Sequence, residues 1–166
     1  MLPLQYRNAN IADLPVIVAI YNSTIASRMV TADTEPVTVD SKIPWFKNHN
    51  PSKRPLLVVE ENDNIVGWAS FQSFYGRPAY NATVEISIYL ESSQRGKGLG
   101  KQVLQHCIDS APGFGVKTLL GFIFAHNIPS LQLFHKLGFE LWGSLPDVAL
   151  LDEVERTVSI LGKRVS

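Results

Sequence analysis

The sequence is poor in cysteine, has no excess charge of either sign and contains no long apolar run. Cys107 is its only cysteine, which excludes an internal disulfide and fits a reducing compartment. Fifteen basic residues balance fifteen acidic ones, so the chain lacks the net field that draws proteins to nucleic acids or acidic membranes. No apolar run approaches the roughly 20 residues that span a bilayer, and the first residues lack the basic and apolar regions of a secretory signal. We therefore predict a cytoplasmic protein with no nucleic-acid partner and no membrane partner.

The composition is typical of one globular unit. Hydrophobic residues make up 45% of the 166 residues and charged residues 18%, as in ordinary globular domains. A chain of this length can bury a hydrophobic core. No repeat, low-complexity tract or linker divides it, so we expect a single domain over residues 1–166.

Hydrophobic periodicity predicts seven strands and four helices. The predicted strands cover 4–8, 56–61, 65–74, 83–90, 118–125, 139–145 and 155–161. The predicted helices cover 11–24, 43–47, 98–110 and 129–137. Residues 27–40 lack a clear period and are expected to form a loop, and Asn62-Asp63-Asn64 is typical of a hairpin turn. Antiparallel hairpins followed by a strand–helix–strand crossover predict a mixed α/β (α+β) fold with a single, mostly antiparallel sheet.

The strand 83–90, TVEISIYL, alternates between two kinds of side chain. One face is apolar and consists of Val84, Ile86, Ile88 and Leu90. The other face carries Glu85, Ser87 and Tyr89. Since side chains of a strand point to opposite faces in turn, the first set is expected to pack into the core and the second to face another layer.

The segment SSQRGKGLGKQVL (92–104) places three glycines between this strand and the next helix. It fails the Walker A pattern, because Gly100-Lys101 is followed by Gln102, and it fails the dinucleotide pattern, because position 101 is not glycine. Glycines nevertheless let the backbone approach a ligand, and the free amides of a helix N-terminus attract anions. Arg95, Lys97 and Lys101 add positive charge. The segment is either an anion site or a flexible turn with solvated basic side chains.

Two segments resemble the signatures of a known family. Residues 95–100, RGKGLG, fit the R/Q-x-x-G-x-G/A loop with which GNAT N-acetyltransferases hold the pyrophosphate of acetyl-CoA. Residues 126–140, HNIPSLQLFHKLGFE, resemble the second signature of that family. The resemblance implies a GNAT-type single domain, in which about four helices flank a sheet of about seven strands with a splayed, parallel central pair.

Three further segments resemble one branch of this family, the phosphinothricin and methionine sulfoximine acetyltransferases. They are TADTEPVT (31–38), FYGRPAYNATVE (74–85) and LPDVALLDEVERTVSILGKRV (145–165). That branch acetylates the α-amino group of small amino-acid-like compounds, and its members are often homodimers.

The resemblance implies acetyl-CoA as the co-substrate and assigns residues to its binding. The implied cofactor-binding residues are Ile88, Tyr89, Leu90, Arg95, Gly96, Lys97, Gly98, Leu99, Gly100, Lys101, Asn127 and Ser130. Backbone amides of residues 95–101, the glycine loop, would hold the pyrophosphate. The strand ending near Leu90 would pair with the pantetheine arm. A backbone N–H of this strand would donate a hydrogen bond to the developing oxyanion. Asn127 has an equally good alternative role as the N-cap of the helix that follows it.

Glu85 is the implied general base. The related enzymes carry a glutamate in the same V-E-x-S-[IV]-Y setting, where it takes a proton from the substrate ammonium directly or through water. A carboxylate of ordinary pKa is a weak base, so partial burial would have to raise its pKa. The alternative is an ordinary exposed carboxylate on a strand.

The general acid is the point of departure from the family. Many relatives have a tyrosine or histidine where this chain has Phe134, which cannot donate a proton. His135 is the next residue, but one step turns a side chain by about 100° around a helix. Water, Tyr89 or another group would have to protonate the CoA thiolate, and no residue is assigned.

Five residues are predicted to contact the acceptor amine. They are Glu35, Phe74, Tyr75, Arg77 and Tyr80. Arginine binds a carboxylate through two hydrogen bonds, so Arg77 would hold an α-carboxylate, Glu35 would reach the ammonium or orient the base, and the aromatic rings would form walls. The alternatives are a solvated loop arginine, a Glu-Pro turn and core aromatic residues.

The remaining reactive side chains predict neither a metal site nor a nucleophile. His49, His106, His126 and His135 have no metal-ligand spacing and no cysteine partner. Cys107 falls on the apolar stripe of helix 98–110 and is expected in the core. The prediction is therefore a metal-free N-acetyltransferase for a small amino-acid-like amine. The alternatives are a protein or peptide N-terminal acetyltransferase and a non-catalytic acyl-CoA sensor.

Overall fold

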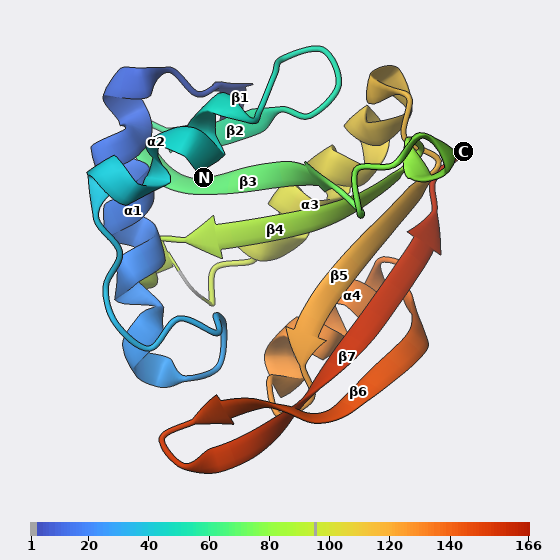
Figure 1. The fold of residues 1–166 in the computed structure, drawn as a ribbon. Coiled ribbons are helices and arrows are strands. Elements are labelled where there is room, and N and C mark those ends of the chain that lie inside the picture. The colour runs from blue at the N-terminus through green and yellow to red at the C-terminus, as the bar shows by residue number, and fades with distance from the viewer. Residues whose placement is uncertain (1–2, 95) are drawn as a thin grey trace.

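The computed structural model describes residues 3–94 and 96–166, and one seven-stranded sheet runs through them (Figure 1). The strands are β1 (Gln5–Asn8), β2 (Leu56–Glu61), β3 (Asn64–Ser73), β4 (Thr83–Leu90), β5 (Thr118–Phe124), β6 (Glu140–Leu151) and β7 (Val154–Arg164). The helices are α1 (Leu14–Ser23), α2 (Val39–Lys47), α3 (Leu99–Ser110) and α4 (Ile128–Lys136). The predicted mixed α/β fold and the order of its elements are confirmed. Within the described residues, no helix is both long and apolar enough to cross a membrane.

The sheet follows the order β1-β2-β3-β4-β5-β7-β6 and opens between β4 and β5. These two central strands are parallel and pair only from Thr83↔Thr118 to Glu85↔Leu120. Beyond this point β4 continues beside β3 as far as Leu90, while β5 continues beside β7. Figure 1 shows the two strands diverging after their short contact. The predicted splayed pair is therefore present.

Helices cover both faces of the half of the sheet formed by β1 to β4. The face that carries Val84 and Ile86 packs against α3 and forms the larger core, in which Cys107 is fully buried. The opposite face packs against α1, and Trp68 lies buried in this second core. The predicted alternation of β4 is confirmed. Its apolar side chains enter the core on the side of α3, and Glu85 and Tyr89 point to the opposite face, which α1 and α2 cover.

Helix α2 begins four residues before the expected position 43. The Thr38 hydroxyl accepts a hydrogen bond from the Ser41 amide at 3.1 Å and caps the helix. The first turn is polar and gives no helical period, which is why the sequence predicted a loop as far as residue 40. Pro44 lies inside the helix, where a proline removes one backbone hydrogen bond.

Strands β6 and β7 are longer than the predicted segments 139–145 and 155–161. Their pairing extends to Leu151↔Val154 beside a tight turn, and register shifts interrupt it between Leu141 and Gly143 and between Leu145 and Ala149. Pro146 falls inside the second irregularity. Because bulges and proline break the two-residue alternation, the outer half of this hairpin has no recognisable strand pattern.

Candidate active site

The opening between β4 and β5 holds a cleft of about 500 Å³. Its lining includes seven of the predicted cofactor-binding residues, which are Ile88, Tyr89, Leu90, Gly96, Gly100, Asn127 and Ser130. Residues 24–30, β5 and α4 complete the walls. Leu99 is buried and anchors the loop, whereas Lys97 and Lys101 are exposed. Arg95 lies outside the described residues.

Backbone groups of β4 face this cleft. The carbonyl of Ala82 accepts hydrogen bonds from the amides of Lys117 and Thr118, at the start of β5, whereas the amide of Glu91 donates to Val66 beside β3. Because the backbone of a strand points to alternate sides, even-numbered residues of β4 face β5 and odd-numbered residues face β3. Beyond the last pairing with β5, the N–H and C=O groups of Ile88 and Leu90 therefore point into the cleft, where an extended ligand can add to the strand.

The glycine loop has a conformation that fits an anionic group. Gly96 and Gly98 both have a φ of 78°, and a Cβ at either position would meet no atom within 4 Å. Gly98 is the N-cap of α3, and no side chain caps the helix there. The first amides of a helix are free and carry a partial positive charge, and Lys97 and Lys101 lie on either side of Gly98. These residues fit the pyrophosphate of a nucleotide-containing cofactor.

Asn127 has the capping role that the sequence offered as an alternative. Its side-chain oxygen accepts a hydrogen bond from the Ser130 amide at 3.3 Å, and its side-chain nitrogen donates to the Met29 carbonyl at 3.0 Å. The residue is 7% exposed and lies in the wall of the cleft. Asn127 thus joins the start of α4 to residues 24–30 across the cleft, and a contact with the pantetheine arm stays a prediction.

Asn127→Ala should lower the free energy of unfolding by about 1–2 kcal/mol, because both a helix cap and a buried hydrogen bond are lost. Urea denaturation followed by circular dichroism measures the change. Gln132→Ala, at an exposed position of the same helix, is the control and should leave stability within about 0.5 kcal/mol of wild type. An unchanged denaturation midpoint in Asn127→Ala would show that neither bond stabilises the fold.

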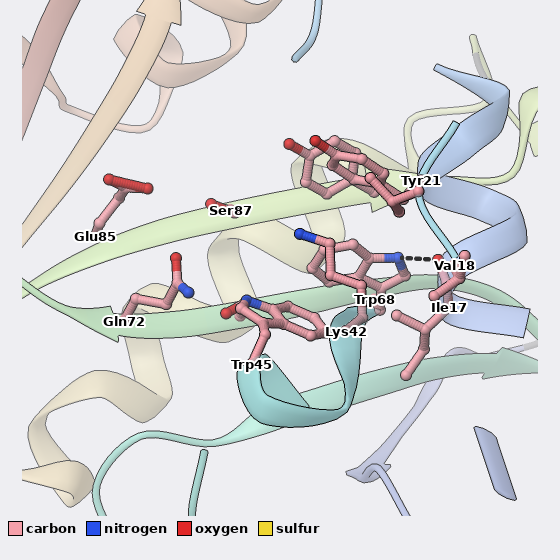
Figure 2. A pocket seen from close by; sticks show the side chains of 12 residues that line it. Ile17, Val18, Tyr21, Lys42, Trp45, Trp68, Gln72, Glu85 and Ser87 are labelled. Atoms are coloured by element: carbon pink, nitrogen blue, oxygen red, sulfur yellow. Dashed lines mark hydrogen bonds between the residues drawn. The ribbon is translucent and has the colours of Figure 1, made fainter. Parts of the chain in front are cut away.

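A second cavity, of about 250 Å³, lies on the other face of the sheet, next to α1 and α2 (Figure 2). Its lining residues are Ile17, Val18, Tyr21, Val37, Lys42, Trp45, Trp68, Ser70, Gln72, Glu85, Ser87 and Tyr89. Ser87 and Tyr89 also line the cleft. The two cavities therefore adjoin at β4, so that a group held in the cleft can react with a molecule held in the second cavity.

Glu85 lies at one end of the second cavity, opposite Gln72 on β3 (Figure 2). Burial raises the pKa of Glu85 above its ordinary value, and a hydrogen bond with the Ser87 side chain acts in the opposite direction. A partly buried carboxylate with a raised pKa is a better proton acceptor than an ordinary one. Glu85 is thus half-buried and not fully exposed, and its role as the general base stays a prediction.

Tyr89 lies at the other end, within a cluster of aromatic rings. Its ring stacks on Trp68 with centroids 4.6 Å apart and lies 5.1 Å from Tyr21. Tyr89 shares a hydrogen bond with Thr31, and the Tyr21 hydroxyl is hydrogen-bonded to Thr31 and Asp33. Burial, and after it the charge of Glu85, raises the pKa of Tyr89 to about 12. Tyr89 is therefore protonated near neutral pH and can donate a hydrogen bond where the two cavities adjoin.

Phe134 lies in the wall of the cleft, whereas His135 does not line it. Phe134 is 7% exposed and packs against Phe139, and a Cβ at Gly121 would lie 2.7 Å from its ring. His135 Nδ1 lies 3.1 Å from the Phe139 carbonyl oxygen. The side chain of His135 is thus engaged at the end of α4. Among the described residues, three or more His, Cys, Asp or Glu side chains nowhere come together, and the absence of a metal cofactor stays a prediction.

The five predicted acceptor residues lie outside both cavities. The rings of Phe74, Tyr75 and Tyr80 pack on one another with centroids 4.4 to 5.7 Å apart, and Tyr75 is 75% exposed. Arg77 and Glu35 are also exposed. Within the described part of the chain these residues do not contact the second cavity, and their roles stay predictions.

Sequence reasoning missed most of the second cavity. The lining residues with polar or aromatic side chains that were not predicted as site residues are Tyr21, Lys42, Trp45, Trp68, Ser70, Gln72 and Ser87. Trp68, Ser70 and Gln72 are every second residue of the predicted strand β3. This spacing indicated that they share one face of the sheet, so the sequence could have placed them together. Lys42 and Trp45 belong to α2, whose start the sequence did not predict, and nothing in the local pattern connects them with β4.

Known proteins resemble this chain over almost its whole length. Residues 17–139 match the Acetyltransferase (GNAT) family. A Bacillus subtilis protein named "Putative phosphinothricin acetyltransferase YwnH" is 53% identical over 161 residues, which is 96% of this chain and 98% of the relative. An L-methionine sulfoximine/L-methionine sulfone acetyltransferase of Pseudomonas aeruginosa is 35% identical over 143 residues, 86% of this chain and 83% of the relative.

A solved structure shows the same fold. It is a GNAT superfamily phosphinothricin acetyltransferase from Sinorhizobium meliloti in complex with acetyl-CoA, with a TM-score of 0.89 at 26% identity over 97% of this chain and 88% of that one. The chain therefore belongs to the GNAT acetyltransferase family and is an acetyltransferase.

Proposed function

We propose that the enzyme transfers the acetyl group of acetyl-CoA to the primary amine of a small amino-acid-like acceptor, of the phosphinothricin or methionine sulfoximine type. One observation carries the proposal: the cleft with the glycine loop and the cavity with Glu85 adjoin at Ser87 and Tyr89. The names of the relatives support the acceptor class. A cavity of about 250 Å³ suits an amino acid, because pockets for larger, drug-sized molecules measure roughly 300–1,000 Å³.

The cleft is the proposed site of acetyl-CoA, which supplies a thioester whose acetyl group passes to the amine with release of the CoA thiol. The amides of residues 96–101 would hold the pyrophosphate, with Lys97 and Lys101 nearby. The outward-facing backbone groups of Ile88 and Leu90 would pair with the pantetheine arm. A backbone N–H at this end of β4 would donate to the oxygen on which charge develops, a contact that contributes a few kcal/mol in related acyl-transfer sites.

Glu85 is the proposed general base. An amine attacks only after its ammonium form has lost a proton, and the Glu85 carboxylate would accept this proton directly or through a water beside Ser87. The raised pKa of Glu85 brings its proton affinity closer to the working pH, as efficient general bases require. Water or Tyr89 would protonate the departing thiolate, and Phe134 excludes the side chain that many relatives use.

In this proposal the protein is a single-domain, cytoplasmic homodimer. One sheet from β1 to β7 supports the single domain. The exposed rings of Tyr75 and Tyr80, which pack on the half-buried Phe74, support an interface, because contiguous exposed apolar patches often mark contact surfaces. Residues 27–40 and 74–82 would meet across that interface, where Glu35 and Arg77 would approach an acceptor bound to the other subunit.

A turnover screen tests the proposed function. Release of free thiol from acetyl-CoA is followed with amino acids, their sulfoximine, sulfone and phosphinate analogues, polyamines and short peptides. We expect turnover with the amino-acid analogues and little with peptides. Preference for peptide N-termini would indicate an N-terminal acetyltransferase. Binding of acetyl-CoA without turnover of any amine would indicate a sensor, and either outcome would contradict the proposal.

A further inference from the structure

We infer that Lys42 determines acceptor specificity by binding an anionic oxygen at the end of the acceptor's side chain, away from the reacting amine. This inference rests on the proposed function, and it narrows the acceptor class to amino acids whose side chain ends in an anionic group such as a phosphinate.

The first observation concerns charge. Among the side chains that line the second cavity, only Lys42 and Glu85 belong to residue types that are charged at neutral pH. The Lys42 ammonium lies 5.6 Å from the centroid of the Tyr21 ring and 5.9 Å from that of the Trp45 ring. Within the described residues, salt bridges involve Arg7 and Arg28, and none involves Lys42. The lining of the cavity therefore presents one carboxylate and one ammonium, and among the described residues no carboxylate forms a salt bridge with that ammonium, although Asp33 is hydrogen-bonded to the hydroxyl of the neighbouring Tyr21.

The second observation concerns position. Glu85 is paired with Gln72 and Tyr89 with Trp68, so these two ends of the cavity are four residues apart along β4, which is roughly 13 Å. Trp45 lies 5.4 Å from Trp68, ring to ring, and places Lys42 at the Trp68–Tyr89 end. In Figure 2 Glu85 lies at one end of the cavity, with Ser87 between it and the Lys42 side chain.

This separation decides which part of an acceptor reaches Lys42. The α-carboxylate of an amino acid is attached to the same carbon as its amine, so an amine next to Glu85 keeps its carboxylate close to Glu85 as well. Only a group several bonds farther along the side chain can reach the ammonium of Lys42. A terminal phosphinate or carboxylate meets this requirement and can form a charge-assisted hydrogen bond there.

Several contacts hold the helix that carries Lys42 against the sheet. His49 Nδ1 lies 2.9 Å from the Trp45 carbonyl oxygen, so it carries the proton and donates, and Nε2 then accepts from the Ser70 hydroxyl at 2.6 Å. Burial lowers the pKa of His49, which keeps the ring neutral in this arrangement. The Thr38 cap fixes the other end of α2. Lys42 is thus presented from a helix that is tied to β3.

Steady-state kinetics on matched variants test the inference. Wild type, Lys42→Met and Lys42→Arg are compared with phosphinothricin, whose side chain ends in an anionic phosphinate, and with methionine sulfone, whose side chain ends in an uncharged group. Lys42→Met should raise KM for phosphinothricin by about 10- to 100-fold, because a hydrogen bond between charged groups is lost. We expect kcat to be nearly unchanged, KM for methionine sulfone to change by less than about 3-fold, and Lys42→Arg to recover most of the affinity for phosphinothricin.

Lys47→Met is the control, because Lys47 is exposed on the same helix and does not line the cavity. It should leave both acceptors unaffected. If Lys42→Met raised KM equally for the two acceptors, Lys42 would have a packing role only. If KM stayed unchanged for both, Lys42 would have no role in binding. Either result overturns the inference while the proposed function stands. Absence of wild-type turnover with both acceptors would overturn the inference together with the proposed function.

Discussion

Glu85→Gln should lower kcat by about 10²- to 10⁴-fold, the range that general acid–base groups contribute. Glutamine keeps the size of the side chain and its hydrogen bonding to Ser87 but cannot accept a proton from the acceptor ammonium. Affinity for acetyl-CoA should stay unchanged, because Glu85 lines the second cavity and not the cleft. Thiol release measures kcat, and titration calorimetry measures binding of acetyl-CoA.

Glu155→Gln is the matched control, since Glu155 is an exposed strand carboxylate on β7. It should retain wild-type turnover. A wild-type kcat in Glu85→Gln would remove Glu85 from the mechanism. Loss of acetyl-CoA binding together with turnover would instead indicate that Glu85 supports the cleft structurally.

The pH dependence follows from the raised pKa of Glu85. Only the ionised carboxylate can act as a base, so kcat/KM for the acceptor should rise as the pH increases through this pKa. This rise should be absent in Glu85→Gln.

The contribution of Glu85 to the stability of the fold depends on pH in the opposite direction. A carboxyl group whose pKa is raised by folding favours the folded state at low pH, and this contribution is lost as the pH rises through the folded-state pKa. Glu85→Gln should therefore be at least as stable as wild type near neutral pH, so lost activity would not reflect unfolding.

Gly98→Val should weaken binding of acetyl-CoA about tenfold or more. Gly98 has a φ of 78°, and a β-branched residue in this left-handed region costs about 1–2 kcal/mol or more. The added side chain would also enter the open space at the N-terminus of α3, where a Cβ meets no other atom within 4 Å. Titration calorimetry with CoA measures the effect.

Gly115→Val separates backbone strain from lost binding. Gly115 has a φ of 76° and equally open surroundings, but it follows the turn after the C-terminal end of α3, whereas Gly98 is the N-cap of α3 and lies between the cleft residues Gly96 and Gly100. Both variants should lose similar amounts of stability, and only Gly98→Val should lose affinity for CoA. Equal affinities in the two variants would mean that the loop does not hold the cofactor.

The parts of the fold with a strict period were predictable, and so were the cleft residues on them. β4 alternates without interruption, so its faces, the position of Glu85 and the start of α3 after the glycines followed from the sequence. The predicted lengths of β6 and β7 were too short because register shifts and Pro146 break the alternation of their side chains. The predicted α2 began too late because its capped first turn is polar.

The acceptor side of the site was much less predictable. The second cavity forms where α1 and α2 lie against the polar face of β3 and β4, and its lining depends on long-range packing that no local pattern encodes. Trp45 and Trp68 are 23 positions apart in the chain, yet their rings lie 5.4 Å apart. The sequence pointed instead to the aromatic residues of 74–80, which are close to Glu85 along the chain but outside the cavity.

A crystal structure with CoA and an N-acetylated amino-acid product tests the central claim most directly. The claim predicts CoA along β4 with its pyrophosphate at residues 96–101, and the product in the second cavity. The acetamide should lie near Glu85 and Ser87, beside the sulfur of CoA. A product bound outside this cavity, for example against Phe74, Tyr75 and Tyr80 alone, would contradict the assignment of the acceptor site and of Glu85 as the base.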